Sequence, residues 1–132
     1  MIDGIGGVFI FSEKPRGLAL WYIKTLGIPL KYLGEKVYYV ELYYRSLSSP
    51  RKKLHTVFAI MPAKGKLGSQ RNQSMINYRV DDLESFVKTL VRRRVKEDPI
   101  HTRPDYEGIG KFTHLKDPEG NRIELWEPST GI

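Results

Sequence analysis

The stretch that most constrains the fold is the run DPEGNRIELWEP at residues 117–128. Its first half predicts a tight turn, because Pro118 fixes φ at a turn position and Gly120 tolerates a positive φ. From residue 122 to 127 polar and apolar side chains alternate, which is the period of a β-strand. The preceding residues 111–116 also form a strand-like run. The sequence therefore predicts a β-hairpin closed by this turn.

The two arms of this hairpin carry the candidate chemistry. On the second arm, Arg122, Glu124 and Trp126 share one face, because successive side chains point to opposite faces of a strand. His114 lies on the first arm. A carboxylate, a cation and a large aromatic side chain suit the wall of a pocket and equally a solvated sheet face. The hairpin alone leaves both interpretations open.

The composition limits the class of protein. A chain of 132 residues supports one domain, or two small modules that share a core. Its 40% hydrophobic and 28% charged residues are ordinary for a globular protein. No run approaches the about 18 uncharged apolar residues of a membrane span, and the N-terminus lacks the pattern of a signal peptide. With no cysteine, disulfides and thiolate chemistry are excluded. We expect a cytoplasmic protein that does not engage a membrane.

The net charge of +7 invites a nucleic-acid interpretation. Two basic clusters supply it, at residues 51–53 and 92–96. The second cluster closes a predicted helix, where cations favour the negative end of the helix dipole. Neither cluster is interleaved with aromatic residues, as single-strand binders tend to be. We therefore favour a solvated basic surface, or attraction of anionic small molecules, over specific nucleic-acid binding.

The chain reads as two copies of one pattern, in which a strand and a helix precede several strands. In the first copy the predicted elements are a strand at 5–11, a helix stopped by Gly27, and strands at 36–45 and 55–61. In the second copy they are a strand at 75–80, a helix that follows the N-cap candidates Asp81 and Asp82, and the hairpin. A glycine-rich polar stretch separates the copies. We predict one domain, 1–132, made of a module at 1–62, a linker at 63–73 and a module at 74–128.

The hairpin run resembles the C-terminal signature D-P-[DE]-G-N-x-I-E-L of the glyoxalase/bleomycin-resistance/extradiol-dioxygenase superfamily, also called the vicinal oxygen chelate family. The segments IGGVF at 5–9 and MINYRVDDL at 75–83 are similar to those of small glyoxalase-like members. The resemblance covers nearly the whole chain. It implies an α+β fold of two βαβββ modules, whose curved mixed sheets form a cup-shaped cavity.

The resemblance also bears on a metal. Members that use a metal place one ligand in each of four strands, usually from histidine, glutamine or glutamate. Carried onto this sequence, the four positions are Gly7, Ala59, Met75 and Glu124. Only Glu124 has a ligand-type side chain, and one carboxylate does not hold a divalent ion tightly against water. We therefore predict no metal and no other cofactor, unless the carried-over positions are misregistered.

The resemblance suggests that His114 faces the same pocket as Glu124, because ring-cleaving relatives carry an acid/base side chain at that spacing. We predict that these two residues are catalytic, as a general acid/base pair. A plain cross-strand polar pair on an exposed face stays the alternative. The candidate substrate-binding residues are Asn77, Arg79, Arg122, Trp126, Phe9 and Phe11.

The predicted function is the binding of a small molecule in the sheet-enclosed cavity, with metal-independent acid/base catalysis of the lyase or isomerase type. One alternative is a non-catalytic protein that sequesters a ligand, of the bleomycin-resistance kind. A second is a metal-dependent lyase or dioxygenase, if the ligand positions are misregistered. A homodimer is expected, because related proteins often pair modules between chains. Neither the substrate nor the existence of a reaction follows from the sequence.

Overall fold

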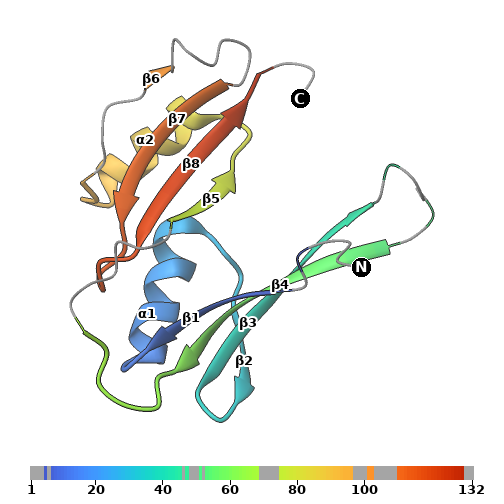
Figure 1. The fold of residues 1–132 in the computed structure, drawn as a ribbon. Helices are drawn as coiled ribbons and strands as arrows, with labels where there is room; N and C mark the ends of the chain where they lie inside the picture. Colours follow the sequence, from blue (N-terminus) through green and yellow to red (C-terminus); the bar gives the residue numbers. More distant parts are fainter. Residues whose placement is uncertain are drawn as a thin grey trace. The chain divides into compact units, whose positions relative to one another are not determined.

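The structure is a computed structural model that describes residues 5, 7–45, 47, 51, 53–68, 75–96, 101–102 and 110–129. The chain divides into two compact units, Met1–Leu67 and Gly68–Ile132. In each unit one strand precedes a helical segment and three further strands follow it (Figure 1). The predicted α+β class and the two βαβββ modules are confirmed.

The first unit is a mixed four-stranded sheet with one helical segment. Its elements are β1 (Gly7–Ser12), α1 (Pro15–Trp21), the π-helical turn η1 (Tyr22–Leu26), β2 (Lys31–Gly34), β3 (Val37–Arg45) and β4 (Lys53–Pro62). The strand order is β1-β4-β3-β2, and β1 runs parallel to β4 while the other pairs are antiparallel. The helix begins at Pro15, where a missing N–H costs little, and the segment ends at Gly27 with φ of 72°.

The core of the first unit lies between this helical segment and one face of the sheet. Tyr22 is fully buried, and its ring centroid lies 5.6 Å from that of Phe58 on β4. Ile60 points to the same side as Phe58 and is also fully buried. By alternation, the odd-numbered residues of β1, including Phe9 and Phe11, lie on the opposite face, where both rings are half exposed. Only one face of this sheet is therefore covered by its own helix.

The second unit repeats the arrangement. Its elements are β5 (Met75–Arg79), α2 (Leu83–Arg92), β6 (His101–Thr102), β7 (Gly110–Lys116) and β8 (Arg122–Pro128). The order is β5-β8-β7-β6, with β5 parallel to β8. The predicted hairpin is formed by β7 and β8, and its Asp117 side chain accepts hydrogen bonds from the backbone of Glu119 and Asn121. These bonds fix the turn, and with it the register of the two arms.

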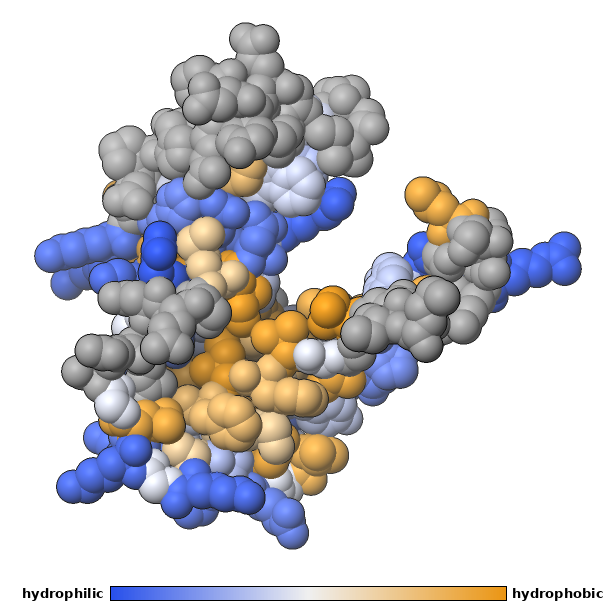
Figure 2. Space-filling model, in the orientation of Figure 1, coloured by the Kyte–Doolittle hydropathy of each residue, from blue (hydrophilic) through white to orange (hydrophobic). Residues whose placement is uncertain are grey.

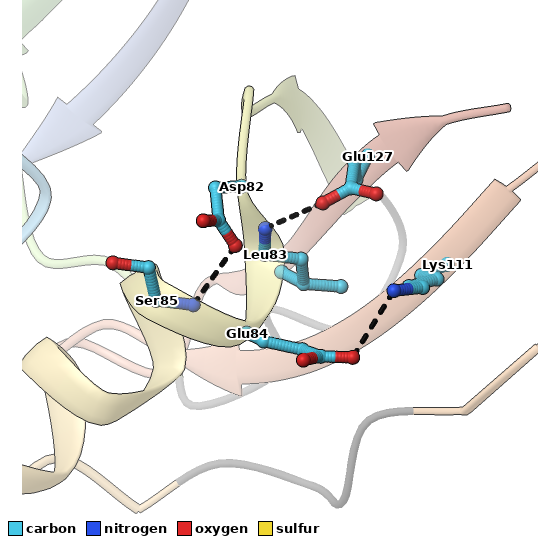
Figure 3. Close-up of polar contacts among 6 residues, drawn as sticks. All are labelled: Asp82, Leu83, Glu84, Ser85, Lys111 and Glu127. Atoms are coloured by element: carbon cyan, nitrogen blue, oxygen red, sulfur yellow. Dashed lines mark hydrogen bonds and ion pairs between the residues drawn. The ribbon is translucent and has the colours of Figure 1, made fainter. Parts of the chain in front are cut away.

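Helix α2 is tied to the sheet at its first turn (Figure 3). Asp82 Oδ1 accepts a hydrogen bond from the Ser85 backbone N–H at 3.1 Å, which is an N-cap. Glu127 Oε1, from β8, accepts one from the Leu83 N–H at 2.9 Å. Two of the N–H groups that a helix start leaves without helical partners are thus satisfied, one of them by the neighbouring strand.

The covered face of the second sheet packs beneath this helix. Leu83 and Leu90 of α2 are fully buried, as are Ile123 and Leu125 of β8. At the margin of this face, Lys111 Nζ of β7 donates to Glu84 Oε1, in the first turn of α2, at 3.1 Å (Figure 3). As in the first unit, the opposite face of the sheet is not covered by the unit's own helix.

The predicted linker begins inside the first unit. The backbone N–H of Ala63 donates to Ser12 O at 2.8 Å, and that of Leu67 donates to Glu13 Oε2 at 3.0 Å. These bonds hold residues 63–67 to the end of β1, so the first unit extends beyond the predicted module end at residue 62. Residues 69–74 lie outside the described part. The cup-shaped cavity stays a prediction. None of the helices in the described ranges is long and apolar enough to cross a membrane.

Candidate functional site

The candidate site lies on the face of the second sheet that is opposite α2, which we call the second open face. It is formed by alternate residues of β5, β8 and β7, and the strand register arranges them in three rows. The middle row is Asn77, Glu124 and His114. The row on one side of it is Arg79, Trp126 and Phe112. The row on the other side is Met75, Arg122 and Lys116.

The middle row is a hydrogen-bonded polar cluster. His114 Nε2 lies 2.7 Å from Glu124 Oε2, and Asn77 Nδ2 donates to Glu124 Oε1 at 2.8 Å. Each carboxylate oxygen thus has a partner from a neighbouring strand. Glu124 is only 8% exposed, so it is a buried acid whose polar atoms are bonded. The structure brings the two predicted catalytic residues into direct contact.

This contact fixes the chemistry available at the cluster. An ionised carboxylate only accepts hydrogen bonds, so Nε2 of His114 carries the proton when Glu124 is charged. The contact is a hydrogen bond when the imidazole is neutral and an ion pair when it is protonated. In either state Glu124 orients the ring. A histidine held in this way can accept and return a proton.

The second row is aromatic and cationic. The indole of Trp126 stacks near Phe112, with centroids 6.3 Å apart and an interplanar angle of 13°. On the other side, Arg79 Cζ lies 5.1 Å from the Trp126 ring centroid, which is cation–π geometry. The row therefore offers a flat, polarised surface next to the acid/base pair.

Gly110 makes room for this row. Its φ is 132°, and a Cβ there would clash with Glu127 O and lie 2.9 Å from Trp126 Nε1. Neither Gly110 nor Phe112 was among the predicted site residues. In the hairpin register, Phe112 lies two pairs beyond His114, opposite Trp126.

The third row adds positive charge. Arg122 and Lys116 are exposed on adjacent strands and their Cα atoms pair directly, with Met75 on the other side of Arg122. The predicted substrate-binding residues of this unit therefore all lie on the second open face. Phe9 and Phe11 belong to the first unit and are not part of this face.

Three of the four positions carried over from the family do not fit a metal. Gly7, Ala59 and Met75 offer no nitrogen or oxygen ligand, whereas Glu124 lies in one row with the polar side chains of Asn77 and His114. A Cβ on Gly7 would lie 2.8 Å from Phe9 Cζ, so a ligand side chain there would have to displace that ring. Within the described ranges, no group of three or more His, Cys, Asp or Glu side chains could hold an ion. The lack of a cofactor stays a prediction.

Solved structures share this fold. The antibiotic-binding protein TnmS3 from a Streptomyces species has a TM-score of 0.65 at 20% identity, over 97% of this chain and 98% of that one. A glyoxalase/bleomycin resistance protein/dioxygenase from Nocardioides has a TM-score of 0.69 at 13% identity, over 100% of this chain and 87% of that one. The fosfomycin resistance protein FosX from Listeria monocytogenes, solved with Mn(II) and sulfate, has a TM-score of 0.68 at 14% identity, over 98% of this chain and 94% of that one.

The comparison with sequence families is decisive for membership. No curated protein matches the sequence. One family model does, and it matches residues 4–125, which is most of the chain. The turn-and-strand signature, the two βαβββ units and this match agree. The chain belongs to the Glyoxalase/Bleomycin resistance protein/Dioxygenase superfamily.

Proposed function

We propose that the protein binds a small anionic molecule on the second open face and transfers a proton to and from it through His114. The observation that carries this proposal is the 2.7 Å contact between His114 and the buried carboxylate of Glu124. A partly covered pair of this kind, flanked by a stacking surface and by cations, is the arrangement that general acid/base chemistry requires.

Each row has a role in the proposed reaction. Arg122 and Lys116 attract the anionic group of the ligand, and Trp126 supplies a flat apolar contact. His114 then takes a proton from an acidic C–H bond, and Glu124 stabilises the imidazolium that forms. Return of the proton to a neighbouring carbon is an isomerisation, and departure of a leaving group instead is an elimination. The proposed class is therefore isomerase or lyase.

The structural neighbours support the binding part of the proposal. TnmS3 is an antibiotic-binding protein and FosX is a fosfomycin resistance protein, so two neighbours have names that concern small molecules. We also propose a homodimer, which follows from the resemblance and is testable by sedimentation. A metal-dependent lyase or dioxygenase is not proposed, because the residues at the metal positions do not fit an ion.

A non-catalytic binding protein is the second candidate. It is favoured by the row of Arg79, Trp126 and Phe112, which supplies a stacking surface without any need for proton transfer. In that case Glu124 and His114 are ligand contacts only, and their replacement weakens binding without removing a turnover.

The two candidates separate in a hydrogen–deuterium exchange assay. A panel of small carboxylates and phosphonates with an acidic C–H bond is incubated in D₂O with chelator-treated protein, and exchange and binding are followed by NMR. We expect catalysed exchange for a subset of the panel. His114→Ala should lower its rate by about 10²–10⁴-fold while binding persists. Glu124→Gln should lower it less, since the amide keeps one acceptor oxygen for the two donors of Asn77 and His114.

A matched control is Lys88→Ala, on an exposed position of α2, which should leave exchange and binding unchanged. Binding without exchange in the wild type would overturn the catalytic proposal in favour of the sequestering one. No binding of any anion in the panel would overturn both candidates.

A further inference from the structure

Strands β3 and β4 continue past the rest of their sheet as a two-stranded ribbon (Figure 1). They stay paired as far as Arg45 with Lys53. Strand β2 pairs only with residues 37–39 of β3, and β1 pairs with β4 only from Val57 onward. On the side away from β4, the described part of the sheet therefore ends at β3 over residues 40–45. This stretch, which we call the β3 edge, can accept a further strand.

The side chains of the β3 edge include a run of large apolar residues. Leu42, Tyr43 and Tyr44 follow one another and are 47%, 56% and 44% exposed. Because successive side chains alternate, both faces of the ribbon carry exposed apolar area. Figure 2 shows hydrophobic side chains on the visible side of this unit, including the ribbon. A two-stranded ribbon is only marginally stable in water, and an apolar edge of this kind is a template for pairing with another chain.

A second copy of the chain carries the same edge. Two copies related by a twofold axis can pair β3 with β3 in antiparallel fashion, which is an isologous contact in which the same residues serve both sides. Directly opposed residues then lie on the same face of the joined sheet. The residue on the axis faces its own copy, and its choice sets every other pair.

The charges of the β3 edge favour one register. Glu41, Tyr43 and Arg45 lie on the sheet face opposite α1, which we call the first open face. With Tyr43 on the axis, Glu41 of each copy lies opposite Arg45 of the other, and Leu42 lies opposite Tyr44 on the other face. An axis at Glu41 or Arg45 would oppose like charges instead. An axis at Leu42 or Tyr44 would bring no opposite charges together.

The carboxylate of Glu41 is already oriented for this contact. Tyr43 Oη donates to Glu41 Oε2 at 2.9 Å, and His55 Nε2 lies 3.8 Å from the same oxygen. The Glu41 side chain is 37% exposed, and the partners that it has among the described residues both approach Oε2. Oε1 can therefore accept a hydrogen bond from a guanidinium group of a second copy, which is a strong, charge-assisted bond.

We propose that two copies of the chain associate through residues 41–45 of β3, paired antiparallel about a twofold axis at Tyr43. The contact joins the sheets of two first units edge to edge. Because the paired stretch is short, the buried area is small, and the dissociation constant is on the order of 10–100 µM. The inference rests on the homodimer in the proposed function and names its surface, and it involves no residue of the second open face.

Charge reversal tests the register, with association followed by sedimentation velocity at rising concentrations of the full chain. Glu41→Arg should weaken association about tenfold or more, because the twofold axis turns two ion pairs into two like-charge contacts. Arg45→Glu should do the same, and the double variant that carries both changes should restore association. Glu35→Arg makes the same charge change at an exposed turn of the same unit, and it should alter association by less than about twofold.

A cross-link tests the position of the axis. The chain has no cysteine, so Tyr43→Cys introduces a single thiol that faces its own copy across the axis. Directly opposed residues of an antiparallel pair have Cα atoms about 4.5–5.5 Å apart, which a disulfide can span. We expect mild oxidation to give a covalent dimer. Tyr32→Cys, at an exposed tyrosine of β2 in the same unit, is the control and should stay largely uncoupled.

The outcomes separate this surface from the rest of the proposed function. A dimer that resists Glu41→Arg, a double variant that fails to recover, or equal cross-linking of the two cysteine variants would each overturn the β3 edge and leave a homodimer through another surface. A chain that is monomeric at every concentration would overturn the edge and the homodimer together. Neither result bears on proton transfer by His114, which the exchange assay tests separately.

Together these variants bracket the contact from its charges and from its centre. Loss with either single charge reversal, recovery with both, and a cross-link specific to Tyr43→Cys are the results that the proposal requires.

Discussion

The two units present equivalent sheet faces with different chemistry. When the first strands of the two units are matched from their first residues, Gly7 with Met75, the row of Phe9, Ala59 and Tyr39 corresponds to the row of Asn77, Glu124 and His114. In the same frame, Glu41 of the first unit corresponds to Lys116 of the second. Among the described residues, the face of the first unit is therefore largely apolar around the accessible carboxylate of Glu41, and that of the second unit is cationic around the buried carboxylate of Glu124.

The same backbone arrangement therefore carries two carboxylates, Glu124 and Glu41, that differ in burial and in their partners. Glu124 is buried and both its oxygens are bonded, so it acts on its neighbours rather than on a ligand. The Glu41 side chain is 37% exposed, and the partners that it has among the described residues both approach its Oε2. Burial and the number of partners, rather than residue type, distinguish a positioning acid from a binding one.

The largest expected effect is on the stability of the second unit. Gly110→Ala places a Cβ at a positive φ and against Glu127 O, and we expect a loss of about 3 kcal/mol of unfolding free energy. Gly17→Ala is the control, because it has open space in α1 and should stabilise by about 0.5–1 kcal/mol. Chemical denaturation measures both. An equal change for the two variants would contradict the role of Gly110.

The next largest effect on stability is expected from replacing the two carboxylates, Glu124 and Glu41. Glu124→Ala removes the acceptor shared by the exposed side chain of Asn77 and the half-buried side chain of His114, which should cost about 1 kcal/mol. Glu41→Ala, on the first open face, should change stability by less than about 0.5 kcal/mol. Denaturant midpoints compare them. If Glu41→Ala proved the more destabilising, the distinction drawn between the two faces would be wrong.

A similar or smaller effect on stability is expected from the capping of the two helices. No side chain caps the start of α1, whereas Asp82 caps α2. Asp82→Ala should therefore cost about 1 kcal/mol, as measured by thermal unfolding. Asp81→Ala removes the same charge from the preceding exposed position and should cost clearly less. Similar losses for both variants would mean that charge near the helix dipole, and not the cap, is responsible.

The smallest effect is spectroscopic. The pKa of Tyr43 is raised chiefly by its bond to Glu41, so stability from this bond is present below the ordinary tyrosine pKa and is lost as pH rises through the raised value. Tyr43→Phe should remove a late component from the tyrosinate absorbance titration, and Glu41→Gln should shift that component to lower pH. Titration curves identical to the wild type would show that the bond does not persist in solution.

Local pattern was sufficient for part of this architecture. The alternation in residues 122–127 and the turn chemistry of Pro118 and Gly120 predicted the hairpin, whereas the resemblance suggested that His114 faces the same pocket as Glu124; the two residues are directly paired. The superfamily resemblance supplied the modular arrangement. These features depend on residues close together in the chain, or on a motif specific enough to carry the fold.

The rest depends on pairings between distant segments. The bond from Asn77 to Glu124 exists because β5 runs parallel to β8, and no local pattern sets that register. The contact of Tyr43 and His55 with Glu41 likewise needs the register of β3 on β4. The hydrogen bonds that hold residues 63–67 to β1 are made by backbone atoms, which composition does not reveal.

The parallel pairing of the first and last strands has a consequence for synthesis on the ribosome. In each unit the last strand lies between the first strand and the preceding one, so neither sheet is continuous until that strand has been made. The first unit is complete in sequence once residue 67 has emerged, and it can fold while the second is still being translated. The second unit gains its central strand, and Glu124 with it, only when translation reaches β8. The cluster on which we propose proton chemistry is therefore completed only after the first unit has been translated.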